Sequence, residues 1–247
     1  MPDALTVQGY RHHPGHHCET NAARNVFAHA GLDLSEEMLF GLGEGLGFIY
    51  WSMKCMQFPV IGYRNGTAGD VLEKACPRLG VGCRAVETKS EGKAYANLRG
   101  LLADGRPACI FLDMGFLPYL RLPEQVHFGG PAVTVFEIDE AAGTARLSDV
   151  LDEPQTVTLE DLRRARGSIY RPFPPKNRLM DFAFPDALPD LGPLALDAIR
   201  ANAEPMAHAP IANLGLRGFG KFAKELRKWP ATMGAEQLLG ALVNAFT

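Results

Sequence analysis

Residues 11–31 read RHHPGHHCETNAARNVFAHAG and contain the clearest helix signal of the chain. The turn-forming pair Pro14–Gly15 precedes the helix, and Gly31 supplies its end. One face is marked by apolar residues at four-residue spacing, namely Ala22, Val26 and Ala30. Cys18 therefore stands in the first turn, where the positive end of the helix dipole favours a thiolate over a thiol.

Helical patterns continue along the chain before strand patterns begin. Further helices are expected at residues 35–40, 67–79 and 92–103, each with a capping residue or an apolar face. From residue 108 on, short runs rich in β-branched and apolar residues predict strands, namely ACIFLDM, PAVTVFEID, ARLSDV and QTVT, and a helix follows from Leu159. Helices first and an antiparallel sheet second indicate an α+β fold.

Prolines interrupt this pattern after residue 172. The segment Arg171–Pro193 contains six of them, Pro172, Pro174, Pro175, Pro185, Pro189 and Pro193. Such a density is typical of a linker, because proline lacks the backbone donor that helices and sheet ladders need. We therefore predict an α+β domain over 1–172, a proline-rich linker over 173–193 and a helical region over 194–247.

Composition excludes several classes of protein. The 247 residues are 47% hydrophobic and 21% charged, as in ordinary globular proteins, and the net charge of -3 gives no field for nucleic acid or an anionic membrane. No secretory signal and no apolar stretch near 18 residues occurs, so we expect a cytoplasmic protein. The five cysteines form no C-x-x-C pair, which argues against a disulfide framework and a zinc ribbon.

Three interpretations compete for Cys18 and the four histidines just before it, His12, His13, His16 and His17. A metal site would need the imidazoles aligned on one helix, and Pro14–Gly15 breaks that helix. A buried, inert thiol is the common fate of a free cysteine, and Cys55, Cys76, Cys83 and Cys109 fit it. The helix-start position favours the third interpretation, a nucleophile, so no metal and no cofactor is expected.

A thiolate nucleophile needs a proton acceptor, for which the downstream histidines are His127 and His208. His127 directly precedes the predicted strand FGGPAVTVFEID, whereas His208 lies between prolines. The hairpin that follows is expected to bring Asp149 alongside His127 to fix its tautomer. Asp152 ranks second, in case the strand register slips.

The order of cysteine, helices, histidine and aspartate resembles the papain-like cysteine peptidases, especially the branch that processes bacteriocin leaders. The stretch HHPGHHCETNAARNVFAHAGLDLSEEMLFGLGEGLGFIYW further resembles the opening of the butirosin biosynthesis protein H family, with a G-x-H-C motif and a glycine-rich loop. The resemblance covers residues 10–170. The tail segment LGLRGFGKFAKELRKWP is similar to the helical domain that usually follows.

The resemblance implies a papain-like fold and acyl transfer through an acyl-cysteine. The donor would be an acyl or aminoacyl thioester on the phosphopantetheine arm of an acyl carrier protein, and the acceptor a small-molecule amine. Cys18 matches the nucleophile, His127 the base and Asp149 the orienting acid. A papain-like cysteine peptidase or amidase is the alternative activity, and a non-catalytic binding module is the third.

Substrate-contacting residues are less well defined. Papain-like enzymes place a glutamine six residues before the cysteine, where this chain has His12. The backbone N–H of Cys18 is expected to be one oxyanion donor, and the second is one of His12, His13 and His17. Glu44, in the glycine loop 41–47, is a candidate for contact with a cationic acceptor amine.

The tail contains a basic amphipathic helix. Its apolar residues are Leu214, Leu216, Phe219, Phe222 and Leu226, and its cations are Arg217, Lys221, Lys224, Arg227 and Lys228. The simpler expectation is a helix packed on the core with a solvated cationic face. The alternative is docking of an acidic carrier protein.

Overall fold

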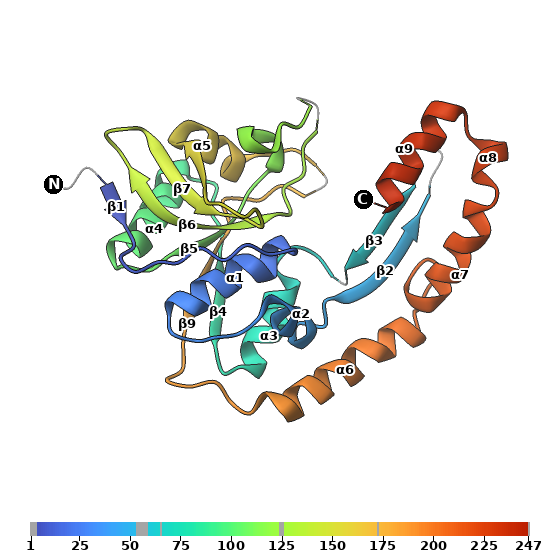
Figure 1. The fold of residues 1–247 in the computed structure, drawn as a ribbon, viewed down its shortest axis with the longest axis horizontal. Helices are drawn as coiled ribbons and strands as arrows, with labels where there is room; N and C mark the ends of the chain where they lie inside the picture. The colour runs from blue at the N-terminus through green and yellow to red at the C-terminus, as the bar shows by residue number, and fades with distance from the viewer. Residues whose placement is uncertain (1–3, 53–58, 65, 124–125, 172, 247) are drawn as a thin grey trace. The chain divides into compact units, whose positions relative to one another are not determined.

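The computed structural model describes residues 4–52, 59–64, 66–123, 126–171 and 173–246. The chain forms two compact units, each made of two separate segments of sequence (Figure 1). Unit 1 comprises Met1–Gly43 and Thr67–Leu191, and unit 2 comprises Glu44–Gly66 and Gly192–Thr247.

An antiparallel sheet organises unit 1. Its described strands run in the order β4 (Gly82–Val86), β9 (Leu179–Ala183), β5 (Ala108–Phe111), β6 (Ala132–Asp139), β7 (Thr144–Ser148) and β8 (Gln155–Thr158), and β1 (Ala4–Thr6) pairs with β6. The β6–β7 register pairs Thr134 with Ser148 and Asp139 with Thr144, with an irregularity between Val135 and Glu137. The predicted hairpin is therefore present.

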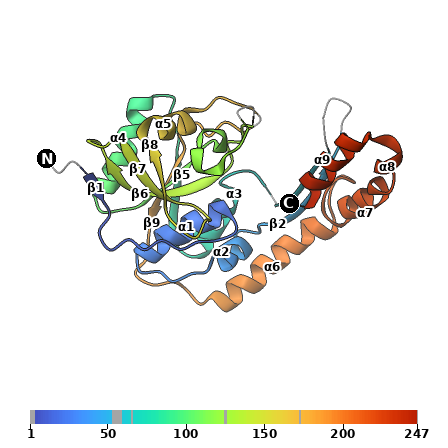
Figure 2. The same ribbon diagram turned by 45° about the horizontal axis from the view of Figure 1, so that its top comes forward.

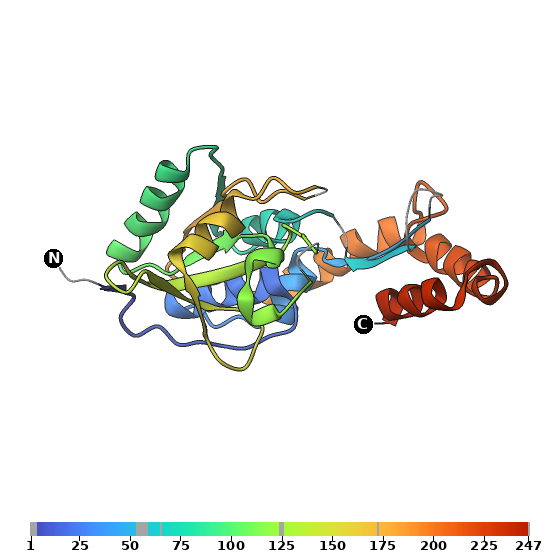
Figure 3. The same cartoon turned by 90° about the horizontal axis from the view of Figure 1, so that it is seen from above.

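Helices cover both faces of this sheet, as Figures 2 and 3 show. One face carries α1 (Cys18–His29), α2 (Glu36–Leu42) and α3 (Asp70–Arg78), and the other carries α4 (Glu91–Ala103) and α5 (Leu159–Gly167). Successive side chains of β6 point to opposite faces of the sheet, so neighbouring residues contact different helix layers. The Thr134 hydroxyl donates to the Ala22 carbonyl of α1 at 2.7 Å, while Val133 and Val135 pack with Leu98 of α4 and Leu162 of α5.

Side-chain caps fix where several helices begin. Ser35 accepts a hydrogen bond from the Met38 N–H, and Thr158 accepts one from the Asp161 N–H. The predicted starts of α2 and α5 are thus confirmed. The helix starting at Cys18 is confirmed as well, with His17 as its N-cap.

The start of α3 uses a carboxylate from another helix. Its N-cap is Gly69, which has a left-handed φ of 99° and no side chain to cap with. The buried Glu19 of α1 accepts hydrogen bonds from the backbone N–H groups of Gly69 at 3.0 Å and Leu72 at 3.2 Å. A negative charge at a helix N-terminus is stabilising, so Glu19 ties α3 to α1.

Unit 2 packs four helices around a two-stranded hairpin. The hairpin is β2 (Leu46–Trp51) and β3 (Val60–Arg64), and the described helices are α6 (Leu191–Ala207), α7 (Gly215–Leu226), α8 (Trp229–Thr232) and α9 (Ala235–Phe246). Its core contains Phe48, Tyr50 and Trp229, and the Phe48 ring stacks on Phe219 with 3.7 Å between centroids. None of the described helices is long and apolar enough to cross a membrane.

The division into units differs from the boundaries predicted at 172 and 193. The segment 173–193 contains β9, which lies between β4 and β5 and pairs with both, so it is not a linker. Its prolines flank the strand rather than interrupt it, which is why their density misled the prediction. In addition, the hairpin segment Glu44–Gly66 belongs to unit 2, so residues 1–172 do not form one unit.

Two smaller expectations also change. The glycine loop 41–47 is mostly regular, because Gly41 lies in α2 and β2 begins at Leu46. Among the cysteines expected to be buried, Cys76 and Cys109 are buried, Cys83 is partly exposed in β4, and Cys55 lies outside the described residues.

Candidate functional site

Cys18 is the first residue of α1 and its side chain is partly exposed. The backbone just before it is held by the buried carboxylate of Glu36, whose Oε1 accepts from the N–H groups of His16 at 2.8 Å and His17 at 3.0 Å. The chain therefore enters α1 along a fixed path, and the thiol is presented at the helix N-terminus.

Gly15 allows this close approach. A Cβ built at this position would lie 2.0 Å from Glu36 Oε2 and 2.6 Å from Asn21. Real Cβ atoms do not come this close to other atoms, so only glycine fits between the two side chains. The glycine of the GHHC motif is thus required by packing around the start of α1.

Gly15→Ala is expected to destabilise the fold by about 1–3 kcal/mol, the usual cost of forcing extra atoms into a packed site. Urea unfolding monitored by circular dichroism measures the change. Gly100→Ala in α4 is the matched control, because its Cβ would meet nothing within 4 Å. Equal stability of the two variants would contradict the packing role of Gly15.

The structure separates the roles of the neighbouring histidines. Both ring nitrogens of His12 are engaged, Nδ1 with the Ser148 hydroxyl at 2.9 Å and Nε2 with the Leu151 carbonyl at 2.9 Å. His12 therefore anchors the N-terminal segment to the end of β7, which corrects the oxyanion role expected for it. His13 exchanges backbone hydrogen bonds with the Asn25 side chain, and burial lowers the pKa of its imidazole.

His17 is the N-cap of α1, and its Nε2 is buried, which does not fit the oxyanion role expected for it. Its Nδ1 lies 2.9 Å from the Thr20 hydroxyl and accepts from the backbone N–H of Thr20 at 3.4 Å. The Phe40 ring packs against the imidazole edge-on, with 5.0 Å between centroids. His17 is therefore a held imidazole, adjacent in sequence to the thiol.

His127 lies in an irregular segment before β6, not at the strand start as predicted. Its Nδ1 is 3.0 Å from Asp113 Oδ2, and the two side chains are 11% and 1% exposed. Asp113 also accepts from the hydroxyl of Ser168 at 2.6 Å and from the backbone N–H groups of Phe128 and Gly115, each at 3.0 Å. An anionic acceptor held this way fixes the tautomer with the proton on Nδ1 and leaves Nε2 as the basic nitrogen.

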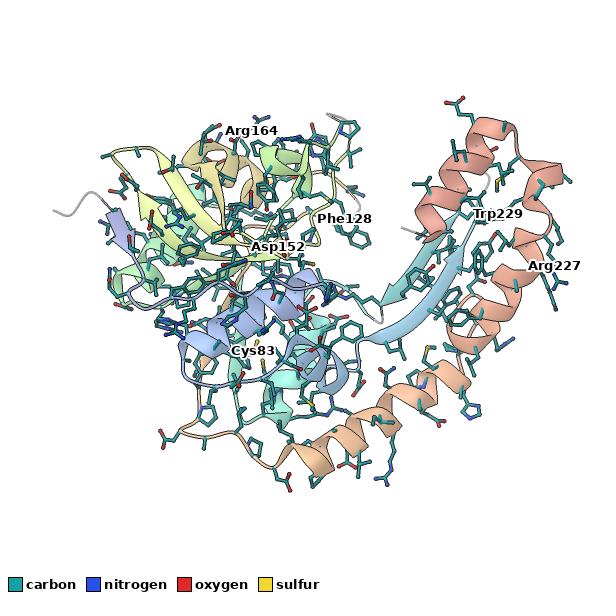
Figure 4. The ribbon with its side chains drawn as sticks, in the orientation of Figure 1. Cys83, Phe128, Asp152, Arg164, Arg227 and Trp229 are labelled. Carbon is teal, nitrogen blue, oxygen red and sulfur yellow. The ribbon has the colours of Figure 1, made fainter. Side chains whose placement is uncertain are left out.

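Asp149 is not the acid that orients His127, which corrects the prediction. The β6–β7 register places Asp149 beyond Ser148, level with Val133, six residues past the histidine. Its Oδ2 accepts from the Tyr119 hydroxyl at 2.8 Å, and burial together with this carboxylate raises the pKa of Tyr119. The second-ranked Asp152 lies in the exposed turn after β7 (Figure 4).

The candidate residues thus fall into two hydrogen-bonded groups. Asp149 belongs with the start of α1, because its carbonyl accepts from the Asn21 side chain at 3.2 Å. His127 and Asp113 belong with the end of α5, through Ser168 and through Tyr170, whose ring stacks on the imidazole at 3.5 Å between centroids. Within the described residues, no group of three His, Cys, Asp or Glu side chains could hold a metal ion.

Sequence reasoning missed Asp113, although its signal is present. The residue follows the fully buried strand Ala108–Phe111. An acidic side chain at a buried position needs hydrogen-bond donors, because leaving it unpaired there costs free energy. Ser168 and Tyr170 carry no comparable signal, because they meet His127 only through the packing of α5.

Comparison with known protein families identifies the family of the chain. Residues 17–150, more than half of the chain, match the family described as "Butirosin biosynthesis protein H, N-terminal". The chain belongs to the butirosin biosynthesis protein H family. The butirosin biosynthesis protein H match spans Cys18, Asp113, His127 and Asp149, and residues 160–246 match a domain of unknown function (DUF4872).

The fold has a counterpart among solved structures. A C39-like peptidase from Bacillus anthracis is similar with a TM-score of 0.51 and 14% sequence identity, over 74% of this chain and 98% of that one. A comparison with curated protein sequences gives no significant match. The α+β, papain-like fold predicted from the sequence is thereby confirmed, and this butirosin biosynthesis protein H relative has the fold of papain-like cysteine enzymes.

Proposed function

We propose that the protein is a cysteine-dependent N-acyltransferase, which moves an acyl or aminoacyl group from a thioester to an amine through an acyl-Cys18 intermediate. The observation that carries this proposal is the partly exposed thiol at the first residue of α1, on a papain-like fold, in a member of a biosynthetic family. The dipole of α1 favours the thiolate that such chemistry needs.

The first proposed step forms the acyl-enzyme. The Cys18 thiolate attacks the carbonyl carbon of the donor, the donor's carbon–sulfur bond breaks, and the departing sulfur takes a proton from the His127 imidazolium. Asp113 is the proposed positioning residue, since it holds the proton on Nδ1 and leaves Nε2 for proton transfer. In the second step, neutral His127 takes a proton from the attacking amine, and the bond between the acyl carbon and Cys18 breaks.

Oxyanion stabilisation is assigned to the α1 start. The backbone N–H of Cys18 is the proposed donor for the negative oxygen of the tetrahedral intermediate. Glu44 follows α2 and has a left-handed φ of 53°. Its contact with the acceptor amine remains part of the proposal.

The proposed donor is an acyl group on the phosphopantetheine arm of an acyl carrier protein, and α7 is its proposed docking surface. Phe222 and Leu226 of this helix pack against the core of unit 2. Arg217 and Lys224 are exposed on α7, and the exposed Arg227 and Lys228 directly follow its last residue. Figure 4 shows Arg227 pointing away from the β2–β3 hairpin. A row of cations complements an acidic partner and steers its approach.

The double substitution Lys224→Glu and Arg227→Glu is expected to raise the KM for a carrier-bound donor by about tenfold, since like charges would replace attraction. The kcat at saturating carrier concentration should be unchanged. A free pantetheine thioester should react at the unchanged rate, because it makes no contact with α7. Lys93→Glu, on the exposed side of α4, is the matched control. An unchanged KM for the carrier would exclude α7 as its docking surface.

The function is tested by intact-mass spectrometry of the protein incubated with an acyl thioester, with and without amines. The expected result is an acyl adduct on the wild type, absent from Cys18→Ala, that an amine discharges to an amide. Rapid release as free acid whether or not amines are present would assign a hydrolase, the activity of peptidases and amidases. Absence of any adduct, with ordinary thiol reactivity at Cys18, would leave a binding module.

A further inference from the structure

A pocket of about 500 Å³ opens beside His127, within unit 1. It lies between the 3₁₀ turns η1 (Met114–Phe116) and η2 (Pro118–Leu120) on one side and α5 on the other. Its walls combine aromatic and charged side chains, including Phe116, Tyr170, Arg121, Arg164 and Asp161. His127 also lines the pocket, and it is the lining residue that the proposed mechanism uses.

The pocket carries an excess of positive charge. Among the described residues that line it, Arg121 and Arg164 supply two guanidinium groups and Asp161 a single carboxylate. Asp161 already accepts from the Thr158 hydroxyl at 2.8 Å at the start of α5. Across the described parts of the chain, neither Arg121 nor Arg164 forms an ion pair with a carboxylate. Both side chains are exposed.

Each arginine is placed by a specific local contact. The Arg164 guanidinium lies over the Phe116 ring, 4.6 Å from its centroid, which aims it across the pocket from α5. Arg121 ends η2 with a left-handed φ of 51°, a conformation that glycine adopts more readily. A strained backbone at a lining position is typical of residues whose side chain serves a ligand.

We infer that this pocket binds a phosphate ester, and specifically the phosphate of the pantetheine arm that carries the acyl donor. The inference rests on the proposed function, because it concerns the same donor. Two planar guanidinium groups offer the paired donors that phosphate oxygens accept, and they match its charge better than that of a carboxylate. The volume exceeds that of one phosphate, and Phe116 and Tyr170 provide apolar contact for the dimethyl group next to it on the arm.

Binding is measured by isothermal titration calorimetry on the full chain carrying Cys18→Ala, so that no acyl transfer occurs. The probes are 4′-phosphopantetheine, pantetheine, coenzyme A and succinate. The expected result is that 4′-phosphopantetheine binds at least about tenfold more tightly than pantetheine, the effect of one charged hydrogen-bonded contact. Arg121→Gln combined with Arg164→Gln should remove this difference, while Arg200→Gln, at an exposed position of α6 in unit 2, should preserve it.

Equal affinity for pantetheine and 4′-phosphopantetheine would overturn the inference, and so would succinate binding as tightly as the phosphate ester. Tighter binding of coenzyme A would support the phosphate site and identify a nucleotide-linked donor instead of a carrier-linked one. The proposed function fails separately: phosphate-dependent binding without an acyl-Cys18 adduct would retain the pocket and reject the acyltransferase. If phosphorylated and unphosphorylated thioesters acylate Cys18 at equal rates, the acyltransferase would be retained and the phosphate-binding pocket rejected.

Discussion

Asp113→Asn is expected to slow acyl transfer by about 10³–10⁴-fold, the loss seen when a catalytic histidine is held in the wrong tautomer. The amide nitrogen would replace the oxygen that faces His127 Nδ1 and the Ser168 hydroxyl. Nδ1 would then accept a hydrogen bond instead of donating one, so the ring proton would sit on Nε2, which could no longer act as the base. Single-turnover acylation of Cys18, followed by mass, measures the change.

Comparing Asp113→Asn with Asp149→Asn tests which of the two aspartates orients the catalytic histidine. Asp149 accepts from the Tyr119 hydroxyl, and an asparagine oxygen can accept the same bond, so we expect less than a tenfold effect. A positioning role for Asp113 also predicts a reduced kcat with a largely unchanged KM, and a displaced pH profile of kcat/KM. A large effect of Asp149→Asn with a small one for Asp113→Asn would reject His127 as the base.

Glu19→Ala is expected to lower the free energy of unfolding by about 3–5 kcal/mol. The substitution leaves the backbone N–H groups of Gly69 and Leu72 buried without their acceptor, each at a cost of about 1–3 kcal/mol. It also removes a negative charge from the N-terminus of α3. The midpoint of urea unfolding, with the slope checked for constancy, measures the loss.

Two variants sharpen this result. Glu37→Ala removes an exposed carboxylate from the first turn of α2 and should change stability by less than about 1 kcal/mol. Glu19→Gln keeps one carbonyl acceptor and should lie between Glu19→Ala and the wild type. Wild-type stability of Glu19→Ala would show that α3 does not depend on Glu19.

Local patterns predicted the elements whose signals lie within a few residues of one another. The four-residue spacing in α1, the serine before α2 and the β-branched run of β6 each report on neighbouring positions only, and each element is present. β9 was missed because its five residues, LMDFA, are hidden among prolines, and only pairing with β4 and β5 makes them a strand. The β2–β3 hairpin lies in the glycine-rich stretch and its continuation, and it packs on helices that come far later in the chain.

The same limit applies to the candidate site. Cys18 was identified because a helix start is a local property. The partner of His127 was not identified, because it depends on contacts between distant segments. The β6–β7 register places Asp149 near α1, and Asp113, which follows β5, contacts His127 instead. Fourteen residues separate Asp113 from His127, and no periodic pattern connects them.

The division of unit 2 into two segments sets an order for folding during synthesis. The hairpin segment Glu44–Gly66 leaves the ribosome well before Gly192, where the helical segment of the same unit begins. At about 5–20 residues per second, the intervening stretch takes roughly 6–25 s to emerge. Phe48 and Tyr50 must wait longer still for Trp229, which lies further along the chain and belongs to the same core. In unit 1, β4 joins the sheet through β9, which also comes late in the chain, so the nascent protein holds two unfinished cores at once.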